Sequence, residues 1–193
     1  MAGDATLDRV DARGSIHGDT FGSPDGLWVD PRGVLWIDTD ISTSTLGRGD
    51  YAHLPNNAML AADTTTGEVK TLIEERLNTY VELKPLRLLA SGEMIHWSER
   101  DGWGHYYLFD AAGTLKNQIT SGEFYCSDIE SVDEKTRTLY FTANGREANE
   151  DPYYTHAYSI NLNGNGLKLL SPGDATHNAA TSDSNKYFVD NCS

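Results

Sequence analysis

Four strand–turn–strand patterns constrain the fold more than any other feature of this sequence. In each, an apolar run is followed by a polar turn and by a second run that carries an aromatic residue. The patterns cover residues 26–37, 86–97, 129–141 and 178–188. Their aromatic residues are Trp36, Trp97, Tyr140 and Tyr187. Successive aromatics lie 61, 43 and 47 residues apart. Four-stranded units at a spacing of roughly 40–50 residues are typical of β-propeller blades.

The rest of the chain also has strand character, because short apolar or alternating segments are separated by Gly, Pro, Asn and Asp clusters. The predicted strands are 26–30, 33–38, 58–62, 68–73, 85–90, 94–99, 104–110, 114–120, 126–133, 138–143, 156–161, 167–170, 177–181 and 186–191. The apolar spacing over residues 69–81 also fits a helix. Since its neighbours are all predicted strands, a strand is favoured there and a helix is the alternative.

The predicted fold is therefore all-β: a single β-propeller domain over residues 1–193, with about four blades of four antiparallel strands. An insertion at 41–55, rich in Ser, Thr and Gly, explains the long first interval. The fourth unit has only two strands, so the last blade is predicted to be incomplete. Residues 6–12 or 14–19 could close it, giving a monomer with a three-stranded blade. Otherwise its open edge would pair with a second chain in a homodimer.

Charge narrows the range of partners. The chain has 15 Lys and Arg against 29 Asp and Glu, a formal net charge of −14. This balance argues against nucleic acid and anionic membrane surfaces, which need a basic face. No apolar run approaches the ~18 residues of a membrane span. The first residues, 1–4, have neither a basic nor an apolar signal region, so no secretion signal is predicted and the localisation is left open.

Cysteine and histidine give weak signals. Cys126 and Cys192 are alone and 66 residues apart, which favours two unpaired thiols over a bridge between neighbouring strands. The six histidines form no i, i+4 pair and no His-Glu-x-x-His motif. Each histidine is therefore interpreted as solvated or hydrogen-bonded rather than as a metal ligand.

Two stretches resemble known families. Residues 17–37 read HGDTFGSPDGLWVDPRGVLWI and residues 57–63 read NAMLAAD. With their flanks, residues 14–75 resemble the propeller of the PhoX-type, metal-dependent alkaline phosphatases. That resemblance implies an iron–calcium cluster in a central channel, held by oxygen ligands from several blades. Of those ligand positions, only Asp25 lies in the matched part.

Asp25 is thus the one candidate metal ligand, with calcium as the possible ion. Because calcium takes six to eight oxygen ligands, a single carboxylate cannot hold it, and the Ser-Pro-Asp-Gly sequence also favours a turn. No cofactor is therefore predicted. A second acidic group, comprising Asp38, Asp40 and Asp50, is interpreted as a solvated loop rather than as a calcium site.

The second resemblance covers residues 79–193. Residues 97–108 read WSERDGWGHYYL and residues 140–147 read YFTANGRE. They resemble the N-terminal propeller of bacterial dipeptidyl peptidase IV-like serine peptidases. The resemblance implies that the Ser-Asp-His triad belongs to a separate α/β-hydrolase domain. It also places the paired glutamates that grip the peptide amino terminus outside the matching region. No Gly-x-Ser-x-Gly nucleophile elbow occurs in the sequence, and residues 99–101 read as turn and ion-pair residues.

The two resemblances meet near residues 74–78, at a boundary between predicted blades. We know of no family that joins them, so the sequence is interpreted as an engineered chimera of residues 1–75 and 76–193. The predicted function is a scaffold without catalytic activity. The alternatives are a residual metal-dependent phosphatase, or a binding module that uses the propeller channel.

Overall fold

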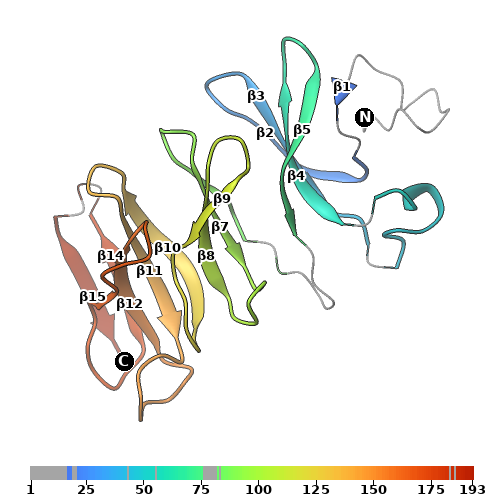
Figure 1. Cartoon of the computed structure of the whole chain (residues 1–193). Helices are drawn as coiled ribbons and strands as arrows, with labels where there is room; N and C mark the ends of the chain where they lie inside the picture. The colour runs from blue at the N-terminus through green and yellow to red at the C-terminus, as the bar shows by residue number, and fades with distance from the viewer. Residues whose placement is uncertain are drawn as a thin grey trace. The chain divides into compact units, whose positions relative to one another are not determined.

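Strands make up nearly all of the regular structure in the computed structural model (Figure 1). The structure describes residues 17–18, 21–42, 44–54, 56–75, 82, 84–182, 184 and 186–193. The chain divides into two compact units, Met1–Thr79 and Tyr80–Ser193. No helix in the described ranges is long and apolar enough to cross a membrane.

The first unit contains one antiparallel sheet. Its strands follow the chain in order: β2 (Pro24–Val29), β3 (Val34–Thr39), β4 (Asn57–Asp63) and β5 (Glu68–Glu75). A short 3-10 helix, η2 (Gly49–Tyr51), lies in the β3–β4 insertion. Because β5 runs as a strand from residue 68 to residue 75, the helix alternative is wrong for that part. Residues 76–81 lie outside the described residues.

A fifth strand, β1 (His17–Gly18), pairs in parallel with the outer edge of β5. His17 lies opposite Glu68, and Gly18 lies opposite Val69. The expectation that segment 14–19 would close the last blade is therefore wrong for these two residues. Without β1, β5 would be the edge of its sheet and would present unpaired N–H and C=O groups there. The other closing candidate, 6–12, lies outside the described part of the chain.

In the described part of the chain, the second unit contains three sheets, which we number second, third and fourth after the sheet of the first unit. The first of them comprises β6 (Arg87–Leu88), β7 (Met94–Ser98), β8 (His105–Phe109) and β9 (Leu115–Gln118). The next comprises β10 (Tyr125–Asp133), β11 (Thr138–Asn144), β12 (Thr155–Asn161) and β13 (Lys168–Leu169). The last contains β14 (His177–Thr181) and β15 (Phe188–Cys192). All the predicted strands are present, although β6 and β13 are shorter than expected.

Aspartate-based turns link many of these strands. In the β8–β9 turn, the Asp110 carboxylate accepts hydrogen bonds from the amides of Ala112 at 2.9 Å and Thr114 at 2.8 Å. The bond from Thr114 is the main cause that lowers the pKa of Asp110. Gly113 has a φ of 84°, a left-handed conformation that suits glycine. The turn signal in the sequence thus corresponds to a defined hydrogen-bonded structure.

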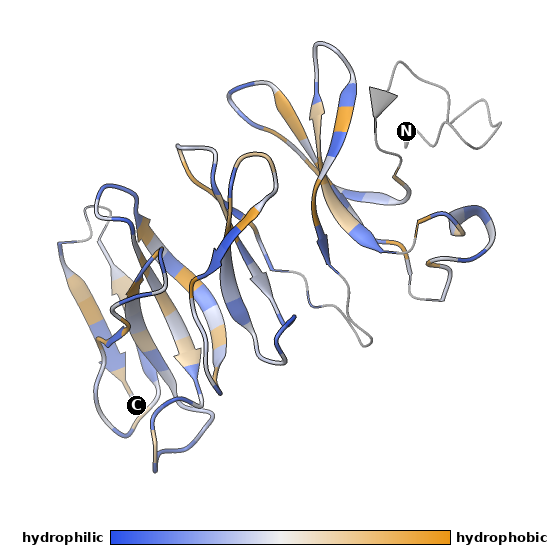
Figure 2. Ribbon diagram, viewed as in Figure 1, coloured by the Kyte–Doolittle hydropathy of each residue, from blue (hydrophilic) through white to orange (hydrophobic). Residues whose placement is uncertain are grey.

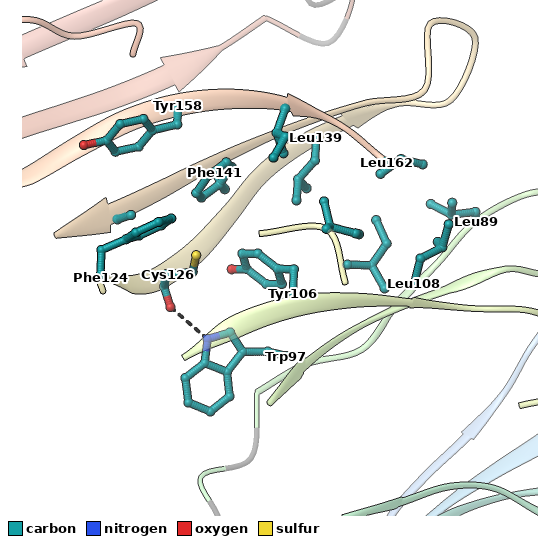
Figure 3. Packing of buried hydrophobic residues seen from close by; sticks show 14 residues of the cluster. Leu89, Trp97, Tyr106, Leu108, Phe124, Cys126, Leu139, Phe141, Tyr158 and Leu162 are labelled. Carbon is teal, nitrogen blue, oxygen red and sulfur yellow. Dashed lines mark hydrogen bonds between the residues drawn. The ribbon is translucent and has the colours of Figure 1, made fainter. Parts of the chain in front are cut away.

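The largest core lies between the second and third sheets (Figure 3). Hydrophobic and hydrophilic residues are interspersed along the strands of both sheets (Figure 2). Its buried members are Leu89, Ile95, Trp97, Tyr106, Leu108, Ile119, Phe124, Cys126, Leu139, Phe141, Ala143, Tyr158, Ile160 and Leu162. The first sheet has a smaller cluster of its own, formed by Phe21, Ile37, Leu60, Ala62 and Val69.

The last sheet is half the size of the others, as predicted for an incomplete blade. Within the described residues, β15 is its edge strand, and every residue of β15 is exposed. On β14, His177 and Ala179 are buried. Cys192 on β15 is an exposed free thiol and Cys126 on β10 is a buried one. Both cysteines are thus unpaired, in agreement with the favoured interpretation.

Candidate functional site

An open pocket of about 200 Å³ lies beside the first strands of the second and third sheets. It brings two cationic side chains, one carboxylate and two hydroxyl groups together with apolar residues. The lining residues are Lys84, Pro85, Leu86, Arg87, Tyr106, Ser127, Asp128 and Ile129. A mixed polar and apolar lining of this kind suits a small polar ligand better than an apolar one.

Lys84 is held firmly at this pocket. Its Nζ donates a hydrogen bond to the Ser127 carbonyl oxygen at 2.6 Å. The same atom lies 5.0 Å from the ring centroids of Trp97 and Tyr125. The Glu82 carboxylate lies 3.9 Å away and accepts a hydrogen bond from the Tyr125 hydroxyl at 3.1 Å. Two aromatic faces and a carboxylate therefore stabilise the ammonium group by cation–π and ionic attraction.

The aromatic wall around Lys84 depends on a close approach at Gly104. A Cβ atom at that position would lie 2.4 Å from Cζ2 of Trp97 and 2.9 Å from the Tyr125 ring. Trp97 donates its indole N–H to the Cys126 carbonyl at 2.8 Å, the dashed contact in Figure 3. Trp97 and Tyr125 meet edge to face at 5.6 Å. The sequence Asp-Gly-Trp-Gly-His thus builds a packed corner, and the turn role expected for residues 99–101 fits it.

The hydroxyl groups near the pocket stay protonated. Burial, followed by the Glu82 carboxylate, raises the pKa of Tyr125 to about 12. Burial also raises the pKa of Tyr106 far above its usual range. Neither tyrosine can therefore act as a base near neutral pH. Their hydroxyl groups can still form hydrogen bonds with a ligand. The residues that line the pocket include no histidine and no cysteine, the side chains that acid–base and nucleophilic catalysis most often use.

A cysteine and a histidine do meet elsewhere, on β10 and β8. The Sγ atom of Cys126 lies 3.6 Å from Nδ1 of His105 and donates to the Thr120 hydroxyl at 3.3 Å. His105 donates from Nε2 to the Gly122 carbonyl at 2.9 Å, and its Nδ1 lies 3.1 Å from the Thr120 hydroxyl. These residue types are those of a covalent catalytic dyad. No spacing rule could predict the pair, since 21 residues separate them.

The surroundings of this pair oppose covalent chemistry. Cys126, His105 and Thr120 are all fully buried. Burial raises the pKa of the Cys126 thiol to about 12, so the thiolate is not formed near neutral pH. Both nitrogens of His105 already have partners inside the sheet. The cluster therefore functions as a hydrogen-bonded part of the core.

The predicted metal ligand lies in the first unit. Asp25 is exposed at the second position of β2. Of the other acidic residues, Asp38 lies opposite Gly26 in the β2–β3 register, and Asp50 lies in η2. In the described part of the chain, no three His, Cys, Asp or Glu residues are arranged to hold a metal ion. Asp25 therefore belongs to no such group of three in the described residues, and the calcium role stays a prediction.

The histidine interpretation fits the second unit in part. His105, His156 and His177 are buried and hydrogen-bonded. His96 is also buried and meets the Phe109 ring edge to face at 6.1 Å. His53 is exposed, and the side chain of His17 is outside the described structure. Burial of these four histidines was not predicted. The carbonyl partners of His105 and His156, for example, are Gly122 and Ser171, which lie 17 and 15 residues away in sequence.

A family model and two curated relatives point to the same family. The family described as "Dipeptidyl peptidase IV (DPP IV) N-terminal region" matches residues 35–193. A probable dipeptidyl peptidase 4 from Aspergillus flavus is 24% identical over 136 residues, covering 65% of this chain and 17% of the relative. A second probable dipeptidyl peptidase 4, from Emericella nidulans, is 24% identical over 137 residues, covering 65% and 18%. The chain thus spans less than a fifth of these relatives.

Solved structures show the same fold. Porphyromonas gingivalis dipeptidyl peptidase 4 superposes with a TM-score of 0.67 at 23% identity, covering 84% of this chain and 21% of that one. A putative dipeptidyl aminopeptidase IV from Bacteroides ovatus gives 0.64 at 24% identity, covering 86% and 25%. The all-β propeller prediction and the second resemblance are confirmed. The chain belongs to the dipeptidyl peptidase IV N-terminal region family.

Proposed function

We propose that the chain is a non-catalytic propeller module of a dipeptidyl peptidase IV-like peptidase, and that it supports and shapes a site whose chemistry lies in another domain. The observation that carries the proposal is the state of the Cys126–His105 pair. This pair has the residue types for covalent catalysis, but it is fully buried and the thiol pKa is raised to about 12.

The other buried histidines support the same proposal. His156 and His177 each place one ring nitrogen against a backbone carbonyl and the other against a carboxylate. Their side chains are 2% exposed, so a substrate cannot reach them without local opening. A general base must come within hydrogen-bond reach of the proton that it removes. These rings serve the packing of the sheets instead.

The test is an activity assay on the purified chain. With a dipeptidyl chromogenic substrate such as glycyl-prolyl-p-nitroanilide, we expect hydrolysis no faster than in buffer. Cys126→Ala and His105→Gln should lower the melting temperature without changing that background. Saturable hydrolysis that disappears in either variant, while the variant stays folded, would overturn the proposal.

The chimeric origin and the phosphatase function are separate hypotheses that rest on the resemblance of residues 14–75. The family match runs from residue 35 to residue 193 and crosses the expected join at 74–78, so a single family accounts for most of both parts. We therefore favour a single origin. The phosphatase hypothesis predicts hydrolysis of p-nitrophenyl phosphate that needs added calcium and iron and is lost in Asp25→Ala. Our proposal predicts no such activity.

The pocket at Lys84 and Arg87 is the observation that favours a second function, binding of a small polar ligand. The two cations suit a carboxylate or phosphate group, whereas Asp128 opposes one. A thermal-shift panel of small carboxylates and inorganic phosphate distinguishes the cases, because a ligand specific for the native state raises the melting temperature. A shift that Arg87→Gln removes would support binding, and no shift across the panel would leave the module without a ligand role here.

A further inference from the structure

Four ionisable side chains meet where the third sheet contacts the β14–β15 hairpin. His156 comes from β12 and His177 from β14, and their ring centroids are 4.9 Å apart. Glu150 comes from the β11–β12 loop and Asp190 from β15. We call these four residues the imidazole clasp. The histidine side chains are 2% exposed, and the carboxylates are 21% and 24% exposed.

His177 lies between two groups that only accept hydrogen bonds. Its Nε2 is 3.1 Å from the Gly173 carbonyl oxygen, and its Nδ1 is 2.7 Å from Oδ2 of Asp190. A neutral imidazole carries one N–H, so it can satisfy only one of them, whereas the imidazolium form satisfies both. Burial alone would lower the pKa of His177, but the bonds to Gly173 and Asp190 outweigh burial and raise it.

His156 also lies between a carbonyl and a carboxylate, but its contacts differ from those of His177. Its Nδ1 lies 2.9 Å from the Ser171 carbonyl oxygen and forms a hydrogen bond there. Its Nε2 lies 2.8 Å from Oε2 of Glu150, but this contact does not have hydrogen-bond geometry. Of the two rings, His177 is therefore the one with hydrogen-bond partners on both nitrogens.

Of the other charged groups near the clasp, Arg146 and Glu147 pair with each other, and Asp174 is exposed in the loop before β14. The Tyr158 ring on β12 lies 6.4 Å from the His156 ring, and its hydroxyl donates to Glu147 at 3.0 Å. Arg146 covers the Tyr158 ring and forms an ion pair with Glu147 at 2.6 Å. Glu150 and Asp190 are the charges that act on His177.

We propose that the imidazole clasp is a pH-dependent contact between the third sheet and the β14–β15 hairpin. It is stabilised when the His177 ring is protonated and weakens as the pH rises. A raised pKa in the folded state means that the stabilisation is fully present below the unfolded value, 6.5, and is lost as the pH rises through the folded value.

The hairpin is suited to local opening. Every residue of β15 is exposed, and β14 buries only part of its surface, against β12 and β10. Thr181 on β14 adds one hydrogen bond to Ser131 on β10, at 3.0 Å. Regions with little buried apolar surface open without global unfolding. Deprotonation of His177 would leave Asp190 beside an uncharged ring and favour the opened state.

Hydrogen exchange of the full chain tests the proposal, with rates corrected for the intrinsic pH dependence of exchange. From about pH 6 to about pH 8.5, the opening constant of β14–β15 should rise about tenfold for each unit of pKa elevation in the folded state. Protection in β7 and β8 should stay constant. Asp190→Asn should open the hairpin at pH 6 and abolish most of the pH dependence. Asp174→Asn is the matched control, since it removes the same charge from an exposed position nearby.

Titration of the histidine ring protons by nuclear magnetic resonance keeps the proposal testable if Asp190→Asn fails to fold. In the unmodified chain, His177 should titrate above 6.5, the ordinary value. A His177 that titrates at or below that value would overturn the proposal. Hairpin protection that is independent of pH, or that changes equally in Asp174→Asn and Asp190→Asn, would also overturn it.

Discussion

The first and second sheets follow the same plan, four antiparallel strands with a tryptophan on the second strand, but they bury their residues differently. Every residue of β7 and β8 is buried. In β2, by contrast, Leu27, Trp28 and Val29 are 62%, 53% and 55% exposed. The second sheet shares a core of fourteen buried residues with the third, whereas the first sheet has a cluster of five.

This difference shows that the formation of a sheet and the burial of its faces have separate causes. Turn residues and alternating side chains form the same four-stranded meander in both regions. An isolated sheet, however, gains little stability until one of its faces packs on another layer. The shared core between the second and third sheets is therefore expected to dominate the stability of the second unit.

The largest expected effect is at Phe141, which is fully buried in that shared core. Its ring stacks on Tyr158 at 5.6 Å and meets Tyr106 edge to face at 6.0 Å. Phe141→Ala should lower the free energy of unfolding by about 3–5 kcal/mol, through lost burial and a residual cavity. Urea denaturation measures it. A cost below about 1.5 kcal/mol would contradict the dominance of the shared core, given the range for such truncations.

The next effect tests the tight corner of the second sheet. Gly104→Ala places a methyl group 2.4 Å from the Trp97 ring and should cost about 1–3 kcal/mol by overpacking. The matched variant in the first sheet is Gly26→Ala, whose nearest neighbour is the movable Asp38 carboxylate at 3.3 Å. We expect the melting temperature to fall clearly for Gly104→Ala and little for Gly26→Ala. Equal losses would show that the two corners are packed alike.

Two carboxylates, Glu93 and Asp30, extend the comparison of the two sheets to the pH dependence of their stability. Bonds from Arg137 and then Lys116 lower the pKa of Glu93 to about 2. Arg137 ties the β6–β7 turn to the third sheet, whereas Lys116 lies on β9 of the second sheet. Burial would raise the pKa of Asp30, but bonds from Arg32, Val34 and Trp36 within one sheet outweigh burial and lower it to about 2.

A lowered pKa means that the stabilisation is present above the unfolded value and is lost as the pH falls through the folded value. Glu93→Gln should therefore cost about 1–2 kcal/mol near neutral pH, because its bonds are charged but its partners are partly exposed. The cost should shrink between pH 4.5 and about 2. Urea titrations at several pH values measure it, and a cost that is constant over that range would contradict the assignment.

Much of the fold could be predicted from the sequence, because its signals are local. The alternation of side chains, the Asp–Gly turns and the aromatic spacing were enough to predict every strand from β2 to β15. The pairing of β1 with β5 was missed, since a two-residue strand has no periodicity of its own. The exposed end of β2 was also unpredictable, because alternation does not say whether a neighbouring layer covers a face.

The polar clusters were much harder to predict. Cys126 and His105 lie on different strands, and His156 and His177 on different sheets, so no spacing rule joins them. The resemblance to the peptidase propeller was confirmed, but it implied no site residue in this chain. Asp25 came from the other resemblance, and among the described residues it belongs to no group of three His, Cys, Asp or Glu that could hold a metal ion. Most of the polar clusters could therefore not be predicted, because they depend on contacts between residues that are distant in sequence.

The smallest expected effect is at Leu27, on the exposed end of β2. Because its side chain is 62% exposed, Leu27→Gln removes little buried apolar surface and should change the free energy of unfolding by no more than about 0.5 kcal/mol. Leu115→Gln on β9, where the side chain is 44% exposed, is the matched change in the second sheet. Urea denaturation of both variants measures the effect. A loss above about 1.5 kcal/mol at Leu27 alone would mean that β2 is covered in solution, since burying a leucine side chain contributes about that much. The burial of the first and second sheets would then be alike, and the contrast between them would fail.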